Sequence, residues 1–212
     1  VSLLSDPPGA SVSIAGQVIG STPLEALNLD AGPTPLDITL PRYQPQQALL
    51  EVTGRGVEQT LSIALAPDWA DITATATPAD ATVWIDDEPR AAAGEAIEVL
   101  SGKHRLSLRA PGYIDATIDL TVVAGVHQIL EPVTLVPAAG VLDLRSSPTA
   151  ANVTVNGEFM GLTPLTIELA PGRDHRLQLN KVGYSRQSFS LSLDKGATAS
   201  RAITLKPKLG NI

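Results

Sequence analysis

The sequence predicts an all-β protein, with three tandem copies of one small antiparallel β-sandwich module in an elongated array. Three observations predict this class. The chain repeats itself at intervals of 70 residues, as Pro67, Pro137 and Pro207 mark out. Its short apolar stretches alternate with the period of two that is typical of strands with one buried face. Glycine and proline, 17 of each, punctuate the chain as they do in small sandwiches and barrels.

Each copy ends in the same way. An alternating apolar segment closes with a proline, which has no N–H to donate to a sheet and therefore ends the strand. The segments are Leu61–Pro67, Glu131–Pro137 and Arg201–Pro207. Their common register predicts three repeats with the boundaries 1–67, 68–137 and 138–212.

Each copy also opens in the same way. A proline stands five residues ahead of a short alternating strand, and turn residues such as Asn156–Gly157 follow that strand. Tight hairpin turns require positive φ, which Asn and Gly tolerate. The prolines and strands are Pro7 with Val12–Ile14, Pro78 with Val83–Ile85 and Pro148 with Val153–Val155.

The stretches between the copies are short. Only Asp68–Asp71 and Ala138–Gly140 separate them. Joints of this length restrict bending, so we expect a semi-rigid arrangement. Trp69 lies in the first joint and is expected to fill the contact between the first two repeats. No stretch predicts an amphipathic helix. The segment 91–100 comes nearest to the helical pattern, but Gly94 interrupts it.

Composition excludes several classes of function. The chain has no cysteine, which removes disulfides, Cys-based zinc sites and thiol catalysis from it. No stretch approaches the roughly 18 apolar residues of a membrane span, so no direct insertion is expected. The net charge of −7 argues against nucleic acid as the partner. The chain starts at Val1 and not at Met, so we expect a signal peptide or anchor to lie outside it.

The charge is distributed unevenly along the chain. The first repeat has 2 basic and 6 acidic residues, the second has 4 and 11, and the third has 9 and 5. The net charges are therefore −4, −7 and +4. Two interpretations of the basic third repeat stay open: drift among surface positions, or an anionic neighbour.

No residue pattern predicts catalysis, a metal site or a cofactor. His104, His127 and His175 lack the local spacing of a zinc site, and surface or strand-edge positions are expected for them. The acidic run Asp86–Glu88 offers oxygens to Ca²⁺, but a calcium site needs about six to eight of them and acidic residues are ordinary at a hairpin tip. There is neither a Gly-x-Ser-x-Gly element nor a phosphate loop before a helix.

Two aromatic residues are the candidates for a binding surface. Trp84 stands between Val83 and Ile85, so alternation places its ring on the face opposite to theirs. Phe159 stands beside Met160 at a predicted loop tip. Exposed aromatic rings of this kind offer stacking surfaces to sugars and peptides.

A longer pattern joins these landmarks. In the third repeat it reads Ser147–Pro148, Val153–Gly157, Gly161–Leu165, Pro171–His175 and Lys181–Tyr184. This pattern resembles the PEGA family, small β-sandwich repeats named for a short motif. The first repeat is similar, except that Arg42 stands where glycine is expected. The second keeps Gly112–Tyr113 but lacks the Gly-x-Thr-Pro element.

The resemblance implies accessory modules of extracytoplasmic proteins, often joined to a catalytic or signalling domain elsewhere in the polypeptide. It supplies no catalytic residue. Its motif positions are interpreted as structural: glycines at tight turns, prolines that hold the preceding threonine extended, and tyrosines that pack on the edge of the core. These positions are Pro7, Gly16, Gly20, Thr22, Pro23, Tyr43, Pro78, Gly102, Gly112, Tyr113, Pro148, Gly157, Gly161, Thr163, Pro164, Gly172, Gly183 and Tyr184.

These observations favour a non-catalytic, extracytoplasmic segment of a larger, membrane-anchored bacterial envelope protein, in the periplasm or at the cell surface. We expect it to act as a semi-rigid spacer and to bind an envelope protein or a cell-wall polymer. One alternative is a carbohydrate- or peptidoglycan-binding module that uses Trp84 or Phe159. Another is an enzyme, which requires a polar cleft at a junction between repeats. The oligomeric state stays open.

Overall fold

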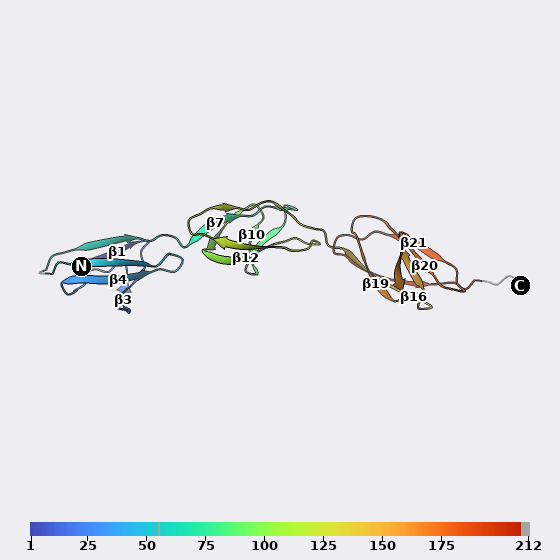
Figure 1. Ribbon diagram of the computed structural model, residues 1–212, viewed down its shortest axis with the longest axis horizontal. Coiled ribbons are helices and arrows are strands. Elements are labelled where there is room, and N and C mark those ends of the chain that lie inside the picture. The colour runs from blue at the N-terminus through green and yellow to red at the C-terminus, as the bar shows by residue number, and fades with distance from the viewer. Residues whose placement is uncertain (55, 209–212) are drawn as a thin grey trace. The chain divides into compact units, whose positions relative to one another are not determined.

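The structure is a computed structural model that describes residues 1–54 and 56–208, and every regular element in these ranges is a strand (Figure 1). The strands form small sheets of two to four strands each. The predicted all-β class and its small antiparallel sheets are confirmed. Below, repeats 1, 2 and 3 denote the predicted ranges 1–67, 68–137 and 138–212.

Backbone contacts group the chain into two compact units. The first comprises Val1–Ala74, Glu95–Arg105 and Asp119–Leu130, and the second comprises the segments between these and the chain from Glu131 onward. Repeat 1 lies wholly in the first unit and repeat 3 wholly in the second. Repeat 2 contributes strands to both.

Repeat 1 is a two-layer sandwich. Its larger sheet is antiparallel, in the order β3 (Gln17–Ser21), β2 (Ser11–Ile14), β4 (Gly32–Thr39), β5 (Gln46–Val52). Its smaller sheet pairs β1 (Ser2–Asp6) with β6 (Thr60–Ala64). Alternate residues of both sheets point inward, and Leu3, Ile38 and Ile63 lie in one buried cluster.

Repeat 3 has the same two layers. The larger sheet has the order β18 (Glu158–Leu162), β17 (Asn152–Val155), β20 (His175–Asn180), β21 (Gln187–Leu191). The smaller sheet has the order β19 (Leu165–Leu169), β16 (Gly140–Ser147), β22 (Thr198–Thr204). Leu144, Ile167 and Leu177 belong to its buried cluster.

Repeat 2 contains the corresponding sheets in more broken form. The larger has the order β10 (Glu88–Ala92), β9 (Thr82–Ile85), β12 (Gly102–Arg109), β13 (Ala116–Val122). A second has the order β11 (Ala96–Leu100), β7 (Trp69–Thr73), β14 (Gln128–Ile129), and a third pairs β8 (Ala76–Thr77) with β15 (Val133–Thr134). Trp69 is the first residue of β7, so the first joint is shorter than the sequence indicated.

Each repeat contains parallel strand pairing, which alternation cannot reveal because it carries no information on strand direction. The pairs are β1 with β6 in repeat 1, β7 with β14 and β8 with β15 in repeat 2, and β16 with β22 in repeat 3. Parallel neighbours start at the same end and need a long crossover, which the other strands of the repeat supply. The chain therefore enters each repeat at one end, here called proximal, and leaves it at the opposite, distal end.

Candidate binding surface

The two aromatic candidates lie on the outer face of the larger sheets, in corresponding hairpins. Trp84 is on β9, opposite Pro89 of β10, and Phe159 is on β18, opposite Thr154 of β17. Trp84 and Thr154 each stand at the centre of the short strand that follows the motif proline. The pairs Trp84–Pro89 and Thr154–Phe159 therefore occupy corresponding places in the two hairpins. Trp84 is on the first strand of its hairpin, whereas Phe159 is on the second strand of its own.

Phe159 is the more accessible of the two. Its side chain is 60% exposed, and it lies in the edge strand β18, not at the loop tip that the sequence indicated. The residues in line with it across the sheet are polar: Thr154, Gln178 and Ser188. This row of one ring and three polar side chains is called the Phe159 row below.

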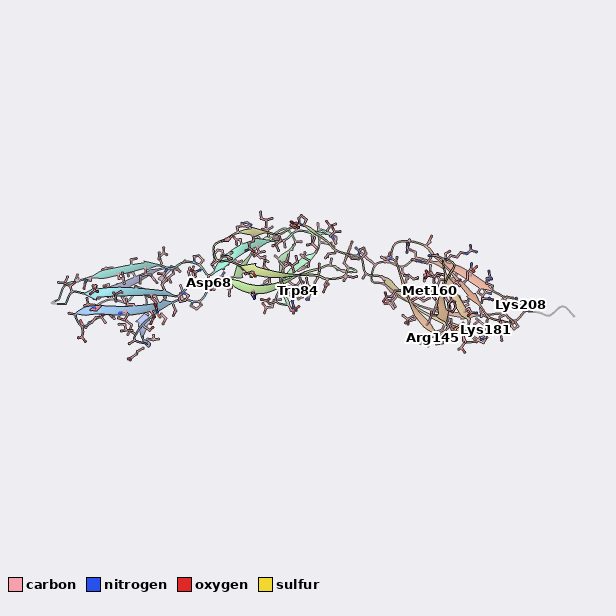
Figure 2. The ribbon with its side chains drawn as sticks, viewed as in Figure 1. Asp68, Trp84, Arg145, Met160, Lys181 and Lys208 are labelled. Carbon is pink, nitrogen blue, oxygen red and sulfur yellow. The ribbon has the colours of Figure 1, made fainter. Side chains whose placement is uncertain are left out.

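A β-bulge lies directly after Phe159 in β18. The register of β17 on β18 shifts between Val153 and Thr154, which leaves Met160 as the extra residue. The corresponding hairpins of the other repeats shift at the same place, which leaves Ile19 and Arg90 as the extra residues. Met160, labelled in Figure 2, is also exposed and directly follows Phe159 in β18.

Trp84 is half-buried, and one face of its ring is covered. The Arg109 guanidinium lies 4.3 Å from the ring centroid, a cation–π contact. The same guanidinium donates to Asp87 Oδ1 at 2.7 Å, and its Nε lies 3.2 Å from Asp115 Oδ2. A ligand that stacks on this face of Trp84 must first displace an arginine held by two carboxylates.

The acidic run at 86–88 is engaged with arginines. Asp87 pairs with Arg109, and Glu88 lies 3.2 Å from Arg90. Within residues 1–54 and 56–208, no group of three His, Cys, Asp or Glu side chains is placed to hold a metal ion.

His175 is buried, with 3% of its surface exposed, so a surface position does not hold for it. Its Nε2 donates to Ala170 O at 2.8 Å, and Asn156 Nδ2 lies 3.3 Å from its Nδ1. His104 Nε2 makes the corresponding bond to Leu100 O at 3.0 Å. These two histidines are repeat-related, as their sequence positions indicated, and each binds its own loop.

The threonine of the Gly-x-Thr-Pro element lies in a buried hydroxyl pair. Ser146 Oγ donates to Pro148 O at 2.6 Å, so its partner Thr163 must donate to it. Thr163 Oγ1 in turn accepts from the backbone N–H of Ala151 at 3.0 Å. Ser5 and Thr22 make the same arrangement in repeat 1, where their oxygens lie 2.5 Å apart. The threonines belong to the repeated sequence pattern, whereas Ser5 and Ser146 stand outside it.

The motif tyrosines close a turn at the distal end of each repeat. The backbone N–H of each tyrosine bonds to the carbonyl three residues before it, and each tyrosine bridges to the closing proline of its repeat. The residue before the tyrosine has positive φ: 70° at Arg42, 76° at Gly112 and 82° at Gly183. These distal turns are Leu40–Tyr43, Ala110–Tyr113 and Lys181–Tyr184.

A second kind of turn lies at the proximal end of each repeat. It is closed by a bond from the N–H of its fourth residue to the carbonyl of its first. In repeat 1 the bond runs from Val57 N to Gly54 O, and in repeats 2 and 3 the turns are Val123–Val126 and Asp194–Ala197.

One residue bridges each junction through its main chain. The N–H of Asp68 donates to Arg42 O at 2.8 Å, and its carbonyl accepts from Ser101 N at 2.9 Å. The N–H of Ala138 donates to Gly112 O at 2.8 Å, and its carbonyl accepts from Gly196 N at 3.0 Å. The first junction lies within the first compact unit and the second within the second.

Side chains add to both junctions. Arg42 pairs with Glu98 at the first, and Ser101 Oγ donates to Asp68 Oδ1. At the second, Lys195 Nζ lies 4.0 Å from the centroid of the Tyr113 ring. A cavity of about 590 Å³ beside it is lined mainly by prolines and glycines, with Asp194 and Lys195 as its charged residues.

The fold and these shared contacts define a class of protein, a tandem array of small β-sandwich repeats. The family model of the PEGA domain matches residues 1–68 and 139–209, and the chain belongs to the PEGA family. PEGA is a non-catalytic family whose domains occur in extracytoplasmic proteins. The match omits 69–138, where repeat 2 lacks the Gly-x-Thr-Pro element. No helix in the described part of the chain is long and apolar enough to cross a membrane.

Two solved structures resemble the chain distantly. The Bacillus anthracis TIE protein has a TM-score of 0.37 at 13% identity, over 98% of this chain and 49% of that one. The Bacteroides ovatus mixed-linkage glucan utilization locus protein SGBP-B, in complex with a mixed-linkage heptasaccharide, has a TM-score of 0.16 at 10% identity, over 94% and 65%. The chain spans about half the length of the first protein and less than two thirds of the second. No curated protein matches the chain.

Proposed function

We propose that this chain is a non-catalytic, extracytoplasmic segment of a larger bacterial envelope protein, in which it acts as a semi-rigid spacer and interaction module. The protein lies in the periplasm or at the cell surface in this proposal, anchored through a part outside this sequence. Its partner is an envelope protein or a cell-wall polymer. The modules of the spacer are the ranges 1–67, 68–137 and 138–212. Membership of the PEGA family supports this reading.

The bridging residues are the observation that carries the spacer role. Asp68 and Ala138 each donate to the distal turn behind them and accept from the repeat ahead. A linker that is hydrogen-bonded on both sides cannot rotate unless one of these backbone hydrogen bonds breaks. Each such bond stabilises the junction by roughly 1 kcal/mol. Bonded linkers therefore favour a defined angle between neighbouring repeats.

Distances between spin labels test the spacer role. Because the chain has no cysteine, labels at Thr39→Cys, Thr121→Cys and Ser190→Cys are specific, and each pair of them spans one or both junctions. We expect a narrow distance distribution by pulsed electron resonance for each pair. Insertion of Gly-Ser-Gly after Asp68 or Ala138 should broaden it. A distribution in the native chain as broad as that of the insertion variants contradicts a semi-rigid spacer.

A second candidate function is binding of a cell-wall glycan, which the Phe159 row favours. An exposed ring stacks on the apolar face of a sugar, while neighbouring polar side chains such as Thr154 and Gln178 bond its hydroxyls. The Arg109 cation already occupies a face of Trp84, so Phe159 is the better of the two candidates.

Retention on purified peptidoglycan tests the glycan function. Phe159→Ala should lower the affinity about fivefold to tenfold, because loss of one stacking surface costs roughly 1 kcal/mol. Val18→Ala is the matched control, since Val18 faces Ser13 at the corresponding cross-strand position of repeat 1. Equal retention of both variants and the native chain excludes the Phe159 row as a glycan site.

A further inference from the structure

The outer face of the larger sheet in repeat 3 extends beyond the Phe159 row. Residues two apart along a strand share a face, so a further row lies on either side of it. These rows are Leu162 with Asn152 and Asn180, and Arg176 with Ser190. None of the residues in the three rows is acidic. Glu158 is opposite the buried Val155, so its side chain belongs to the other side of the sheet.

The side chains of this face have the chemistry that a glycan site needs. Phe159 and Leu162, on the edge strand β18, are 60% and 49% exposed and offer apolar surface to a sugar ring. Arg176 adds an exposed positive charge. Amide and hydroxyl groups, which bond sugar hydroxyls, fill the rest of the rows. They belong to Asn152, Thr154, Gln178, Asn180, Ser188 and Ser190.

The Arg176 guanidinium has no carboxylate partner within residues 1–54 and 56–208. None of the ion pairs in this part of the chain includes a basic residue of repeat 3. The backbone beneath Arg176 is held in place, since its N–H donates to Asn156 Oδ1 at 2.8 Å. A guanidinium that is free of partners offers two parallel N–H donors to a carboxylate.

The separation of Phe159 and Arg176 indicates the size of the ligand. The two residues lie two strands and one row apart, which corresponds to about 12 Å between their backbones at the usual spacings of a sheet. A ligand that uses both side chains therefore extends across two strand spacings. This favours a chain of sugars over a single sugar.

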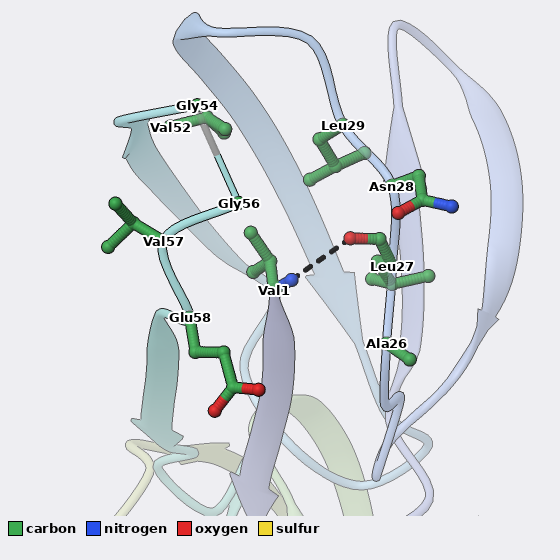
Figure 3. A pocket seen from close by; sticks show the side chains of 10 residues that line it. All are labelled: Val1, Ala26, Leu27, Asn28, Leu29, Val52, Gly54, Gly56, Val57 and Glu58. Carbon is green, nitrogen blue, oxygen red and sulfur yellow. Dashed lines mark hydrogen bonds between the residues drawn. The ribbon is translucent and has the colours of Figure 1, made fainter.

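Repeat 1 does not offer the same chemistry to an anion. On its corresponding face Asp37 stands where repeat 3 has Gln178, and Asp37 Oδ1 accepts from Gln47 at 2.8 Å. Repeat 1 also has a hollow of about 300 Å³ beside Val57, and Glu58 lines it (Figure 3). A carboxylate in each place repels an anionic ligand.

Repeat 2 has an arginine at the corresponding position, but this arginine is engaged. Arg105 corresponds to Arg176 in the register of the sheet, and its Nε lies 3.9 Å from Asp119 Oδ1. Trp84, on the same face, already carries the Arg109 guanidinium. In the described part of the chain, an arginine without a carboxylate partner beside an exposed aromatic ring is therefore a feature of repeat 3.

We propose that the outer face of repeat 3 binds a glycan whose sugars carry carboxylates. Phe159 stacks on one sugar ring, and Arg176 binds the carboxylate of a sugar further along the chain. The net charge of +4 on repeat 3 attracts such a ligand. A phosphate-linked polyol lacks the ring face that Phe159 and Leu162 would contact. The proposal rests on the glycan function proposed above and specifies its ligand class.

Calorimetric titration with galacturonate oligomers and with their methyl esters tests the ligand class. The ester keeps the sugar rings and removes the charge. The acid form should bind at least about tenfold more tightly, because only the acid form offers Arg176 a charge-assisted pair of hydrogen bonds. Arg176→Gln should abolish this difference and leave binding of the ester unchanged. Arg145→Gln is the matched control, since Arg145 is on the smaller sheet (Figure 2).

Two further substitutions separate stacking from charge. Phe159→Ala should weaken binding of the acid and the ester alike, by about fivefold to tenfold. Gln178→Glu keeps the size of the side chain and introduces a carboxylate, as Asp37 does in repeat 1. It should weaken binding of the acid form alone. Thermal unfolding checks that each variant is folded.

Several results overturn the proposed ligand class. Equal affinity for acid and ester is one, and an equal effect of Arg145→Gln and Arg176→Gln is another. A third is polyglutamate that binds as tightly as the oligomers and does not need Phe159, since the face then recognises charge alone. If acid and ester bind equally and both need Phe159, the glycan function stands and only the carboxylate assignment is wrong. If neither form binds, the assignment is wrong, and retention on peptidoglycan decides separately on the glycan function.

Discussion

At the scale of single residues, the clearest difference between the repeats concerns two positions that change together. Repeats 1 and 3 bury a serine and a threonine hydroxyl that share one site, whereas repeat 2 has alanine at both positions. The pairs are Ser5 with Thr22, Ser146 with Thr163, and Ala76 with Ala93. Replacing both partners of a buried hydrogen bond is nearly neutral, whereas removal of one leaves the other unsatisfied. The two positions must therefore change together.

A double-mutant cycle in repeat 3 tests this coupling. Thr163→Ala should destabilise the repeat by about 1–3 kcal/mol, because it leaves the Ala151 N–H and the Ser146 hydroxyl without this partner. The double variant Ser146→Ala with Thr163→Ala should cost clearly less than the sum of the single variants, by about 0.5–3 kcal/mol. Denaturant unfolding monitors the transition. If the two single-variant losses in unfolding free energy simply add, the two residues are not coupled. That result would contradict the interpretation that repeat 2 lost both hydroxyls together.

The sequence allowed some of these residue roles to be predicted and hid others. Alternation placed Trp84 on the outer face, because Val83 and Ile85 are buried beneath it. It could not reveal the Arg109 guanidinium over the ring, because that contact comes from a strand paired across the sheet. The burial of His175 was missed for a similar reason, since its partners depend on how the loop at Ala170 folds back.

At the scale of elements, the distal turns of repeats 2 and 3 have different constraints. Gly112 has φ of 76°, and a Cβ there would lie 2.7 Å from Lys195 O. Gly183 has φ of 82° at the corresponding place in repeat 3, and nothing lies within 4 Å of its Cβ direction. The two glycines share one backbone strain, but only the first also permits close approach of a neighbouring repeat.

Hydrogen exchange separates these two roles. Gly112→Ala and Gly183→Ala should each strain their own turn by about 1 kcal/mol. Only Gly112→Ala should speed exchange at the amides of Ala138 and Gly196, by about tenfold or more, because only it forces the second junction apart. Equal effects of the two variants on these amides would mean that the junction does not depend on the close approach at Gly112.

Spacing in the sequence identified the elements but not how they are joined. The closing prolines at 67, 137 and 207 predicted where strands end, because proline cannot donate to a ladder. The parallel pairing of β16 with β22 left no trace, since alternation is the same in either direction. The bridging roles of Asp68 and Ala138 are also invisible in sequence, because they use the N–H and C=O that nearly every residue has.

At the scale of the whole molecule, the repeats differ more in charge than in fold. Repeat 1 and repeat 3 share the strand order of their larger sheet and the hydroxyl pair, yet their net charges are −4 and +4. A charge difference between equal scaffolds affects which partners approach each end.

The parallel pairing of first and last strands has a mechanical consequence. A pull on the two ends of a repeat loads such a pair in shear, so all its residue pairs must yield together and not one after another. Seven residue pairs resist in β16–β22 of repeat 3, five in β1–β6 of repeat 1, but only two each in β7–β14 and β8–β15 of repeat 2. We therefore expect repeat 2 to yield first under tension and to lengthen the chain while repeats 1 and 3 stay folded.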